Sequence, residues 1–351
     1  MALVNRNFSD IVTFTRASAA LYTNSAGVLT TAAINAPRID FSAAGVALGL
    51  LIEEQRTNLA LWNRDLTNAA WVKSNITAAK DQTGADGVVN SASSITATAA
   101  NGTVLQTITS ASAERVQSAY VKRISGVGTV EMTQDNGATW TAITVTASWA
   151  VVEVPKATVA NPVIGFRIAT SGDAIAVDYA QNEVGAFRTS AIGTTTAAVT
   201  RAADVATIST LAPWFNAVEG TIYCEVASAD TTGSKAFAYY FDDTTSNNSI
   251  YSDVSSGNRR GVVFSGGAAQ AAIAMGAITS GVAAKTAFAY KANDFAGSLG
   301  GGAEVTDVSG SVPIVTRLAL GNNFSSSASI NGWLRKIIYY PAKKNTQTLT
   351  A

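Results

Sequence analysis

Apolar and polar residues alternate with a period of two along much of the chain, whereas helical periodicity is almost absent. One such run places Ile222, Cys224 and Val226 on the same face of an extended strand. The residues between them, Tyr223 and Glu225, fall on the opposite face. This pattern predicts β-strands as the main elements of the fold.

Two further runs follow the same pattern. Phe237, Tyr239 and Phe241 are expected on one face of a second strand. The even-numbered residues from Leu334 to Tyr340 are expected on one face of a third strand, which Pro341 ends because proline lacks the amide proton that a ladder needs. Short runs of this kind, separated by Gly, Asn, Asp and Ser, are typical of antiparallel sheets.

The strongest local signal is Asn136-Gly137, which lies between two β-rich runs at 128–133 and 138–143. Asparagine and glycine both tolerate the positive φ angles that the two central residues of a type I′ turn require. We therefore predict a β-hairpin that has these two runs as its strands.

Together these signals predict an all-β fold, with two antiparallel β-sandwich (jelly-roll) domains in tandem after an extended N-terminal segment. The stretch between Phe187 and Asp204 is hydroxyl-rich and nearly free of large residues, which predicts an extended linker. The expected division is an N-terminal segment at 1–60, a first sandwich at 61–187, the linker at 188–204 and a second sandwich at 205–351.

The composition excludes several kinds of chemistry. The 351 residues include 24 basic and 24 acidic side chains, so the chain lacks the basic surface that nucleic acid or an anionic membrane requires. It contains no histidine and one cysteine. Catalytic sites that depend on histidine, zinc sites built on His or paired Cys, and a disulfide within the chain are therefore excluded.

Targeting signals are missing from the sequence. Arg6 and Asp10 interrupt the apolar run that a signal peptide would need. Two uncharged stretches, 87–113 and 261–284, are broken by Ser, Thr, Asn, Gln and Gly, so we expect no membrane insertion. The sequence is typical of a soluble chain that is made in the cytosol and keeps its lone thiol unpaired.

An ordered series of motifs begins near the N-terminus with Phe14-Thr-Arg-Ala-Ser18 and Pro37-Arg-Ile-Asp40, followed by Gly49-Leu-Leu-Ile-Glu-Glu-Gln-Arg-Thr-Asn-Leu59. This order resembles a module of tailed-bacteriophage virion proteins, and the third motif is fairly specific to it. The stretch 185–204 is similar to the segment that follows a carbohydrate-binding-module-like sandwich in those proteins. The C-terminal part, including 331–341, looks like their concanavalin-A-like (laminin-G-like) jelly roll.

The resemblance implies a structural protein of the virion surface, a fibre or adhesin that is assembled in the host cytoplasm. It implies attachment to other virion proteins, of capsid or tail, through the N-terminal segment, and a homotrimer that binds host-surface polysaccharide. A capsid head fibre or decoration protein with a purely structural role is the alternative, and a glycan-degrading enzyme ranks third. We expect no enzyme, because no strand offers the pair of carboxylates that glycosidases use.

Two groups of polar residues are candidates for a site. Glu53, Glu54 and Arg56 could perform acid-base chemistry, but a structural ion pair that fastens the N-terminal segment to the middle sandwich is the favoured interpretation. The second group is an oxygen-rich loop, which could bind sugar hydroxyls or structural calcium. A solvated turn is the favoured alternative for this loop, and no other cofactor is expected. The loop residues and the tyrosine that follows them are Asp242, Asp243, Asn247, Asn248 and Tyr251.

The tryptophans form a third candidate group, because exposed aromatic rings can pack against the apolar faces of sugars. Trp140 directly follows the Asn-Gly turn and is expected to be exposed at an end of its sandwich, so it joins the predicted ligand-binding residues. Core packing is favoured for the other five, which are Trp62, Trp71, Trp149, Trp214 and Trp333.

Overall fold

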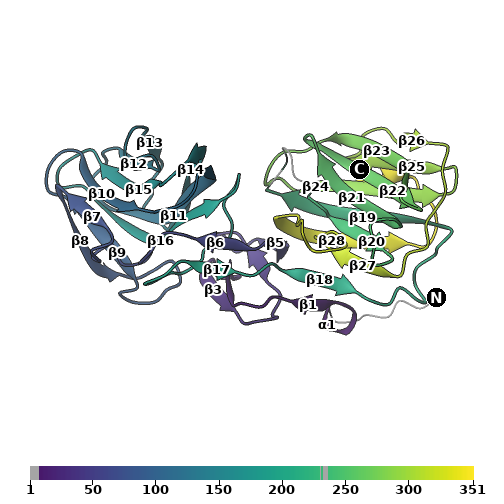
Figure 1. The fold of residues 1–351 in the computed structure, drawn as a ribbon, viewed down its shortest axis with the longest axis horizontal. Helices are drawn as coiled ribbons and strands as arrows, with labels where there is room; N and C mark the ends of the chain where they lie inside the picture. The colour runs from purple at the N-terminus through teal and green to yellow at the C-terminus, as the bar shows by residue number, and fades with distance from the viewer. Residues whose placement is uncertain (1–7, 230, 232–235) are drawn as a thin grey trace.

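The structure is a computed structural model that describes residues 8–229, 231 and 236–351. Two β-sandwiches lie side by side, with N-terminal strands between and beneath them in the view of Figure 1. The only helices in this part of the chain are α1 (Phe8–Ile11) and α2 (Thr346–Thr350), so the all-β prediction is confirmed. Neither of these two helices has the length and hydropathy of a membrane span.

The middle sandwich consists of two five-stranded antiparallel sheets. In spatial order, one sheet contains β13 (Thr141–Ile143), β12 (Val130–Thr133), β15 (Val163–Ile168), β10 (Gly102–Thr107) and β7 (Val72–Ser74). The other contains β14 (Ala150–Val159), β11 (Ala113–Ser125), β16 (Ala174–Val184), β9 (Ala92–Ala97) and β8 (Ile76–Gln82). Buried side chains such as Val104, Phe166 and Val177 fill the space between the two sheets, which stabilises the sandwich.

The C-terminal sandwich consists of two seven-stranded sheets. One contains β1 (Thr13–Thr15), β18 (Val205–Ile208), β27 (Arg317–Leu320), β20 (Tyr239–Asp242), β21 (Ser249–Ser255), β22 (Asn258–Ser265) and β23 (Ala268–Ala277). The other contains β26 (Val305–Asp307), β25 (Phe295–Leu299), β24 (Ala284–Lys291), β19 (Glu219–Ser228), β28 (Gly332–Tyr340), β5 (Ala47–Ile52) and β4 (Ile39–Phe41). Ile222, Phe241 and Phe288 lie in the core between them.

Three strands from the first 60 residues belong to this C-terminal sandwich. β1 pairs with β18, β4 pairs with β5, and β5 pairs with β28 so that Leu50 lies opposite Leu334. The apolar side chains of Leu50 and Ile52 are buried in the sandwich core, which explains the apolar run in this segment. The four-part division of the chain stays a prediction. The backbone hydrogen bonds of β1 and β5, however, join the segment 1–60 to the sandwich at 205–351.

The stretch predicted as a linker is extended, yet it packs between the sandwiches. β17 (Val199–Arg201) pairs with β6 (Arg56–Asn58), and a hairpin of β2 (Ala20–Thr23) and β3 (Leu29–Ala32) lies among the N-terminal strands. Ile192, Thr194 and Asp204 are buried. The small side chains of this stretch therefore allow close packing at the junction.

The predicted inward residues of β19 are all buried in the core, which confirms that alternation. The prediction for the second run was wrong for Phe237. This residue precedes β20 and packs beside Tyr240 in a separate cluster, whereas Tyr239 and Phe241 face the main core. The regular alternation begins only where the strand itself begins.

A β-bulge changes the predicted faces of β28. The register of β28 against β19 skips Arg335, so the faces exchange at that residue. Leu334 is buried in the core, and beyond the bulge Ile337 and Tyr339 pack against the core instead of the even-numbered residues. The strand ends just before Pro341, as predicted.

The Asn-Gly signal is confirmed in its backbone angles. Asn136 and Gly137 have φ values of 62° and 78°, and β12 and β13 pair as an antiparallel hairpin. The strands are shorter than predicted, and the loop spans 134–140 rather than two residues. Asp135 forms a parallel bridge with Val163, so this loop is tied to a neighbouring strand.

Candidate functional site

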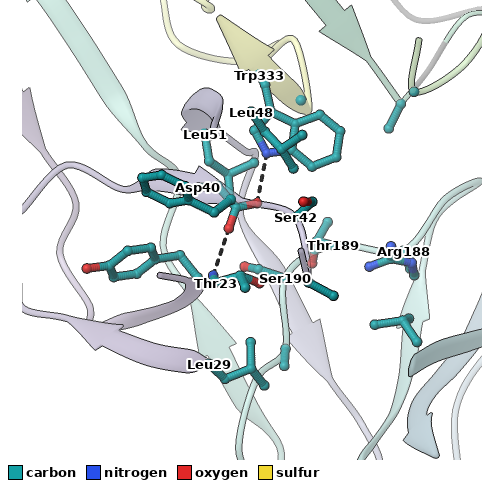
Figure 2. Close-up of a pocket in the computed structure, with 18 of the residues that line it drawn as sticks. Thr23, Leu29, Asp40, Ser42, Leu48, Leu51, Arg188, Thr189, Ser190 and Trp333 are labelled. Carbon is teal, nitrogen blue, oxygen red and sulfur yellow. Dashed lines mark hydrogen bonds between the residues drawn. The ribbon is translucent and has the colours of Figure 1, made fainter. Parts of the chain in front are cut away.

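A cleft of about 480 Å³ opens where the two sandwiches and the N-terminal strands meet. Its lining comes from β2, β4 and β5, from β11 and β14 of the middle sandwich, from the stretch after β16 and from the start of β28. Figure 2 shows part of this lining, with Asp40, Ser190 and Trp333 among the labelled side chains. Because most of these segments are anchored in sheets, the cleft is preformed, as ligand sites usually are.

Asp40 on β4 holds Trp333 of β28 in the wall of the cleft. The indole Nε1 of Trp333 donates a hydrogen bond of 2.8 Å to Asp40 Oδ2, and the backbone N–H of Thr23 donates one of 2.7 Å to Asp40 Oδ1 (Figure 2). Burial raises the pKa of Asp40, although these two hydrogen bonds oppose the shift. This contact fixes an indole of the C-terminal sandwich against an N-terminal strand.

Tyr120 and Trp149 bring aromatic surface from the middle sandwich. Trp149 Nε1 donates to the carbonyl oxygen of Thr83 at 3.3 Å, and the ammonium group of Lys122 lies 4.9 Å from the centre of the Trp149 ring. Burial raises the pKa of Tyr120 to about 12, so its hydroxyl is neutral near pH 7. The cleft therefore has aromatic groups from both sandwiches in its lining.

Charged groups lie in the same cleft and remain accessible. Arg188 Nε is 3.3 Å from Glu153 Oε2, and these side chains are 39% and 55% exposed. An exposed ion pair of this kind contributes little to stability. Both side chains can therefore turn toward a polar ligand at small cost.

Behind Glu53, which lines the cleft, lies a buried cluster that we call the ionic hub. It contains Arg16, Arg38, Arg201, Glu53 and Asp204. Arg16 Nη1 lies 3.0 Å from Asp204 Oδ1, and Arg38 Nη2 lies 2.8 Å from Glu53 Oε2. Arg38 also contacts Asp204, 166 positions away in the sequence. The hub therefore joins the N-terminal motifs to the stretch between the sandwiches.

Glu53 is a structural carboxylate in this arrangement. Ser190 donates to it from its backbone N–H at 2.7 Å and from its hydroxyl at 2.6 Å. Burial alone would raise the pKa of Glu53, but Arg201, Arg38 and Ser190 outweigh burial and lower it to about 2. Glu53 is therefore ionised at neutral pH, and both of its carboxylate oxygens have partners within the protein.

The other charged residues of the same motif join the two sandwiches. Glu54 Oε1 lies 2.6 Å from Arg56 Nε, and Glu54 Oε2 accepts a hydrogen bond of 3.0 Å from Asn331 Nδ2. Arg56 donates to the carbonyl oxygen of Val184 at the end of β16. These contacts run from the C-terminal sandwich to the middle one, and they agree with the structural interpretation of Glu53, Glu54 and Arg56.

The polar loop between β20 and β21 is a self-contained turn. Asp242 is buried, with its Oδ1 2.6 Å from Arg317 Nε. Asp243 Oδ2 accepts a hydrogen bond of 2.7 Å from Asn248 Nδ2, while Asn247 is exposed. The loop brings Asp243 and Asn248 together but turns Asp242 toward the sandwich. Within the described ranges, no group of three or more His, Cys, Asp or Glu side chains could hold a metal ion.

The remaining predicted ligand-binding residues lie in different sandwiches. Tyr251 is 5% exposed, and its ring stacks on that of Tyr240 at a centroid distance of 4.8 Å. Trp140 is half-buried, and the guanidinium of Arg167 lies 4.5 Å from the centre of its ring. The predicted residues therefore do not form one site, and their role in binding stays a prediction.

The other tryptophans divide into two groups. Trp71 is buried, and Trp62 and Trp214 pack against the cores, as expected. Trp149 also packs against a core cluster, the smaller one around Leu29 and Tyr179, as expected, although it lines the cleft as well. Trp333 was expected in a core, but it lines the cleft and bonds to Asp40 instead. The polar partners of these two tryptophans come from distant segments, and no local pattern indicates such a position.

Sequence reasoning missed the cleft as a site. Asp40, Tyr120 and Arg188 were not candidates, and they lie on three separate segments. The one available signal was the pair of motifs Pro37-Arg-Ile-Asp40 and Asn331-Gly-Trp333, which the bond from Trp333 to Asp40 joins.

Comparisons with known proteins add little to this picture. No family model and no curated protein matches the chain. Among solved structures, domains LG4-5 of the mouse laminin alpha1 chain match with a TM-score of 0.31 and 10% identity over 73% of this chain and 92% of that one. The extracellular region of zebrafish Gpr126/Adgrg6 matches with a TM-score of 0.25 and 9% identity over 69% of this chain and 33% of that one. Likeness at this level carries no functional argument.

Proposed function

We propose that this chain is a structural protein displayed on the surface of a tailed-phage virion, where its cleft binds glycans of the host surface. The observation that carries the proposal is the cleft itself, which combines aromatic rings from two sandwiches with an accessible ion pair. The phage-like order of the N-terminal motifs supports the location. Every one of those motifs contributes to the junction that shapes the cleft.

The chemistry of the cleft suits a sugar. Pyranose rings have apolar C–H faces that pack on aromatic side chains such as Trp149, and hydroxyl groups that bond to charged groups such as Arg188 and Glu153. One shallow site of this kind binds weakly. In the proposed homotrimer, several copies on one particle bind together, and their avidity exceeds the affinity of a single site.

We propose binding without cleavage. Both carboxylate oxygens of Asp40 already accept hydrogen bonds, and Glu53 is held by arginines. A glycosidase needs two carboxyl groups about 5–9.5 Å apart that are free to act on the bond. The second candidate is a head fibre or decoration protein with a structural role, which the ionic hub favours because it fastens the parts of the chain together. A glycan-degrading enzyme ranks third.

A glycan array with the purified chain, followed by calorimetry on the best ligand, tests this proposal. We expect Trp149→Ala to weaken binding at least tenfold, because it removes a ring from the cleft lining. Trp140→Ala tests the other predicted aromatic residue, which lies outside the cleft, and it should bind like the unmodified chain if the glycan binds in the cleft. Loss in Trp140→Ala but not in Trp149→Ala would move the site to Trp140. A blank array would favour the structural role, and imaging of particles would then locate the protein on capsid or tail.

A further inference from the structure

The C-terminal sandwich is open along one edge of β28. β5 pairs with β28 only through residues 332–334, and no other described strand pairs with that edge beyond Leu334. From Gly49 to Ala47, β5 pairs with β4 but not with β28, and Gly49 has a φ of 122°. A Cβ at Gly49 would lie 2.6 Å from the carbonyl oxygen of Leu334, so only glycine fits there. Residues 335–340 therefore present an unpaired strand edge.

This edge borders an apolar groove of about 600 Å³ between the two sheets. Ile337 and Tyr339 of β28 line it together with Ile208 of β18 and Leu318 of β27. Ile11 of α1, which is 50% exposed, also lines it. No acidic side chain of the described residues lines the groove. A continuous apolar surface next to a free strand edge is unusual for a solvated sheet.

The outer face of β28 beside the groove is basic. Arg335 Nη1 lies 3.5 Å from Glu225 Oε1, its one carboxylate neighbour among the described residues. The ammonium group of Lys336 lies 5.9 Å from the centre of the Tyr223 ring, and no carboxylate in the described ranges is within ion-pair distance of it. Acidic groups on an incoming partner would complement this charge.

We propose that this edge binds an extended peptide segment of a partner protein, which adds to β28 as a further strand. A peptide backbone supplies both the donors and the acceptors that the unpaired edge lacks, whereas a hydrocarbon chain supplies neither. At about 3.3 Å per residue, the free edge of β28 accommodates a strand of roughly six residues. Alternate apolar side chains fill the groove, and acidic side chains on the other face meet Arg335 and Lys336.

This binding site lies on the other side of β5 from the glycan cleft. Leu48 lines the cleft, whereas Ala47, Gly49 and Leu50 line the groove. The inference therefore stands or falls independently of the proposed glycan site. It also gives the N-terminal strands a second role, because they form part of the surface that holds the partner.

A fluorescein-labelled octapeptide of alternating valine and glutamate tests the proposal in fluorescence-polarisation titrations with the full chain. We expect saturable binding and at least a tenfold loss with Ile208→Trp, whose indole occupies the groove. Val305→Trp is the control, since Val305 is 43% exposed on the far edge strand β26. If circular dichroism shows that Ile208→Trp does not fold, Ile11→Glu, at an exposed position, places a repelling charge beside the groove instead.

A charge exchange tests whether the basic side chains of β28 contribute to peptide binding. Lys336→Glu should weaken binding of the valine-glutamate peptide at least threefold and strengthen binding of a valine-lysine peptide. Absence of binding up to 1 mM overturns the proposal, as does equal binding by all variants. Binding of lauric acid without the peptide would assign the groove to a hydrocarbon ligand. Self-association that Ile208→Trp abolishes, again without peptide binding, would assign it to a second copy; either result overturns the peptide partner.

Discussion

The ionic hub and the loop Asp242–Asn248 are both clusters of polar residues, but they are built over very different distances in the sequence. Contacts of the hub join residues 188 and 166 positions apart, and its side chains are almost completely buried. In the loop, Asp243 bonds to Asn248, five positions away, and the turn is largely exposed. A local cluster can satisfy its own hydrogen bonds in a turn, whereas a distant one must bring separate parts of the fold together.

The comparison shows why the more conspicuous cluster in the sequence is the less informative one. Asp and Asn close together in sequence are what a turn requires, so they say little about a ligand. The residues of the hub are scattered among motifs, and each alone resembles a surface charge. Their importance comes from burial, because charges removed from water persist only when they are paired.

Removing one hub carboxylate is expected to have the largest effect. Asp204→Ala leaves Arg16, Arg38 and Arg201 with one carboxylate, and uncompensated buried charge lowers the free energy of unfolding by about 3–5 kcal/mol. Asp243→Ala, in the loop, should cost less than about 1 kcal/mol. Chemical denaturation followed by fluorescence and circular dichroism compares the two. Equal costs would show that the hub is no more important than a surface turn.

The next largest effect is expected in the pH dependence of the free energy of unfolding. The pKa of Glu53 falls from its ordinary 4.5 to about 2 in the folded chain. A lowered carboxyl pKa stabilises the fold above pH 4.5, and this contribution, up to roughly 3 kcal/mol, is lost as the pH falls toward 2. Unfolding free energies measured between pH 7 and pH 2 should fall less steeply in Glu53→Gln.

Glu114→Gln is the matched control for this titration. Glu114 pairs with Lys156 on the surface, where both side chains are 44% exposed. Screening by solvent makes such a pair weak, so this variant should keep the slope of the unmodified chain. If Glu53→Gln also keeps the pH dependence of the unmodified chain, the loss of stability in acid comes from other groups.

Calcium is expected to have the smallest effect. Asp242 is already paired with Arg317, and Asp243 with Asn248, so the loop offers few free carboxylate oxygens. Calcium takes 6–8 oxygen ligands. Thermal unfolding with 5 mM calcium or with EDTA should therefore give the same Tm within 1 °C. A rise with calcium that Asp243→Ala removes would restore the loop as a metal site.

Patterns between residues close in sequence were enough to predict the strands, but not their irregularities or the way they pack. The alternation in β19 and the positive φ angles of Asn136 and Gly137 depend on residues close in sequence, and both are confirmed. The bulge at Arg335 reverses the faces of β28, and an irregular approach to β20 displaces Phe237. No local pattern indicates either of them.

The cleft could not be predicted, because its parts meet only through pairings between distant segments. Trp333 and Asp40 lie 293 positions apart, and the six tryptophans look alike when only neighbouring residues are considered. The motifs did mark the segments that matter. The motif pattern did not indicate that the side chains of these segments bind to one another and not to a ligand.

The pairing of β5 with β28 also determines the order in which the chain can be completed. All strands of the middle sandwich lie within 72–184, so this sandwich can form as soon as those residues leave the ribosome. β5 is made earlier and can pair with β4, but its other edge finds β28 only after residues 332–334 have been translated. Until then that edge is open, and a chain interrupted before β28 keeps an unpaired strand edge that favours aggregation. The C-terminal sandwich can therefore be completed only after translation has reached β28.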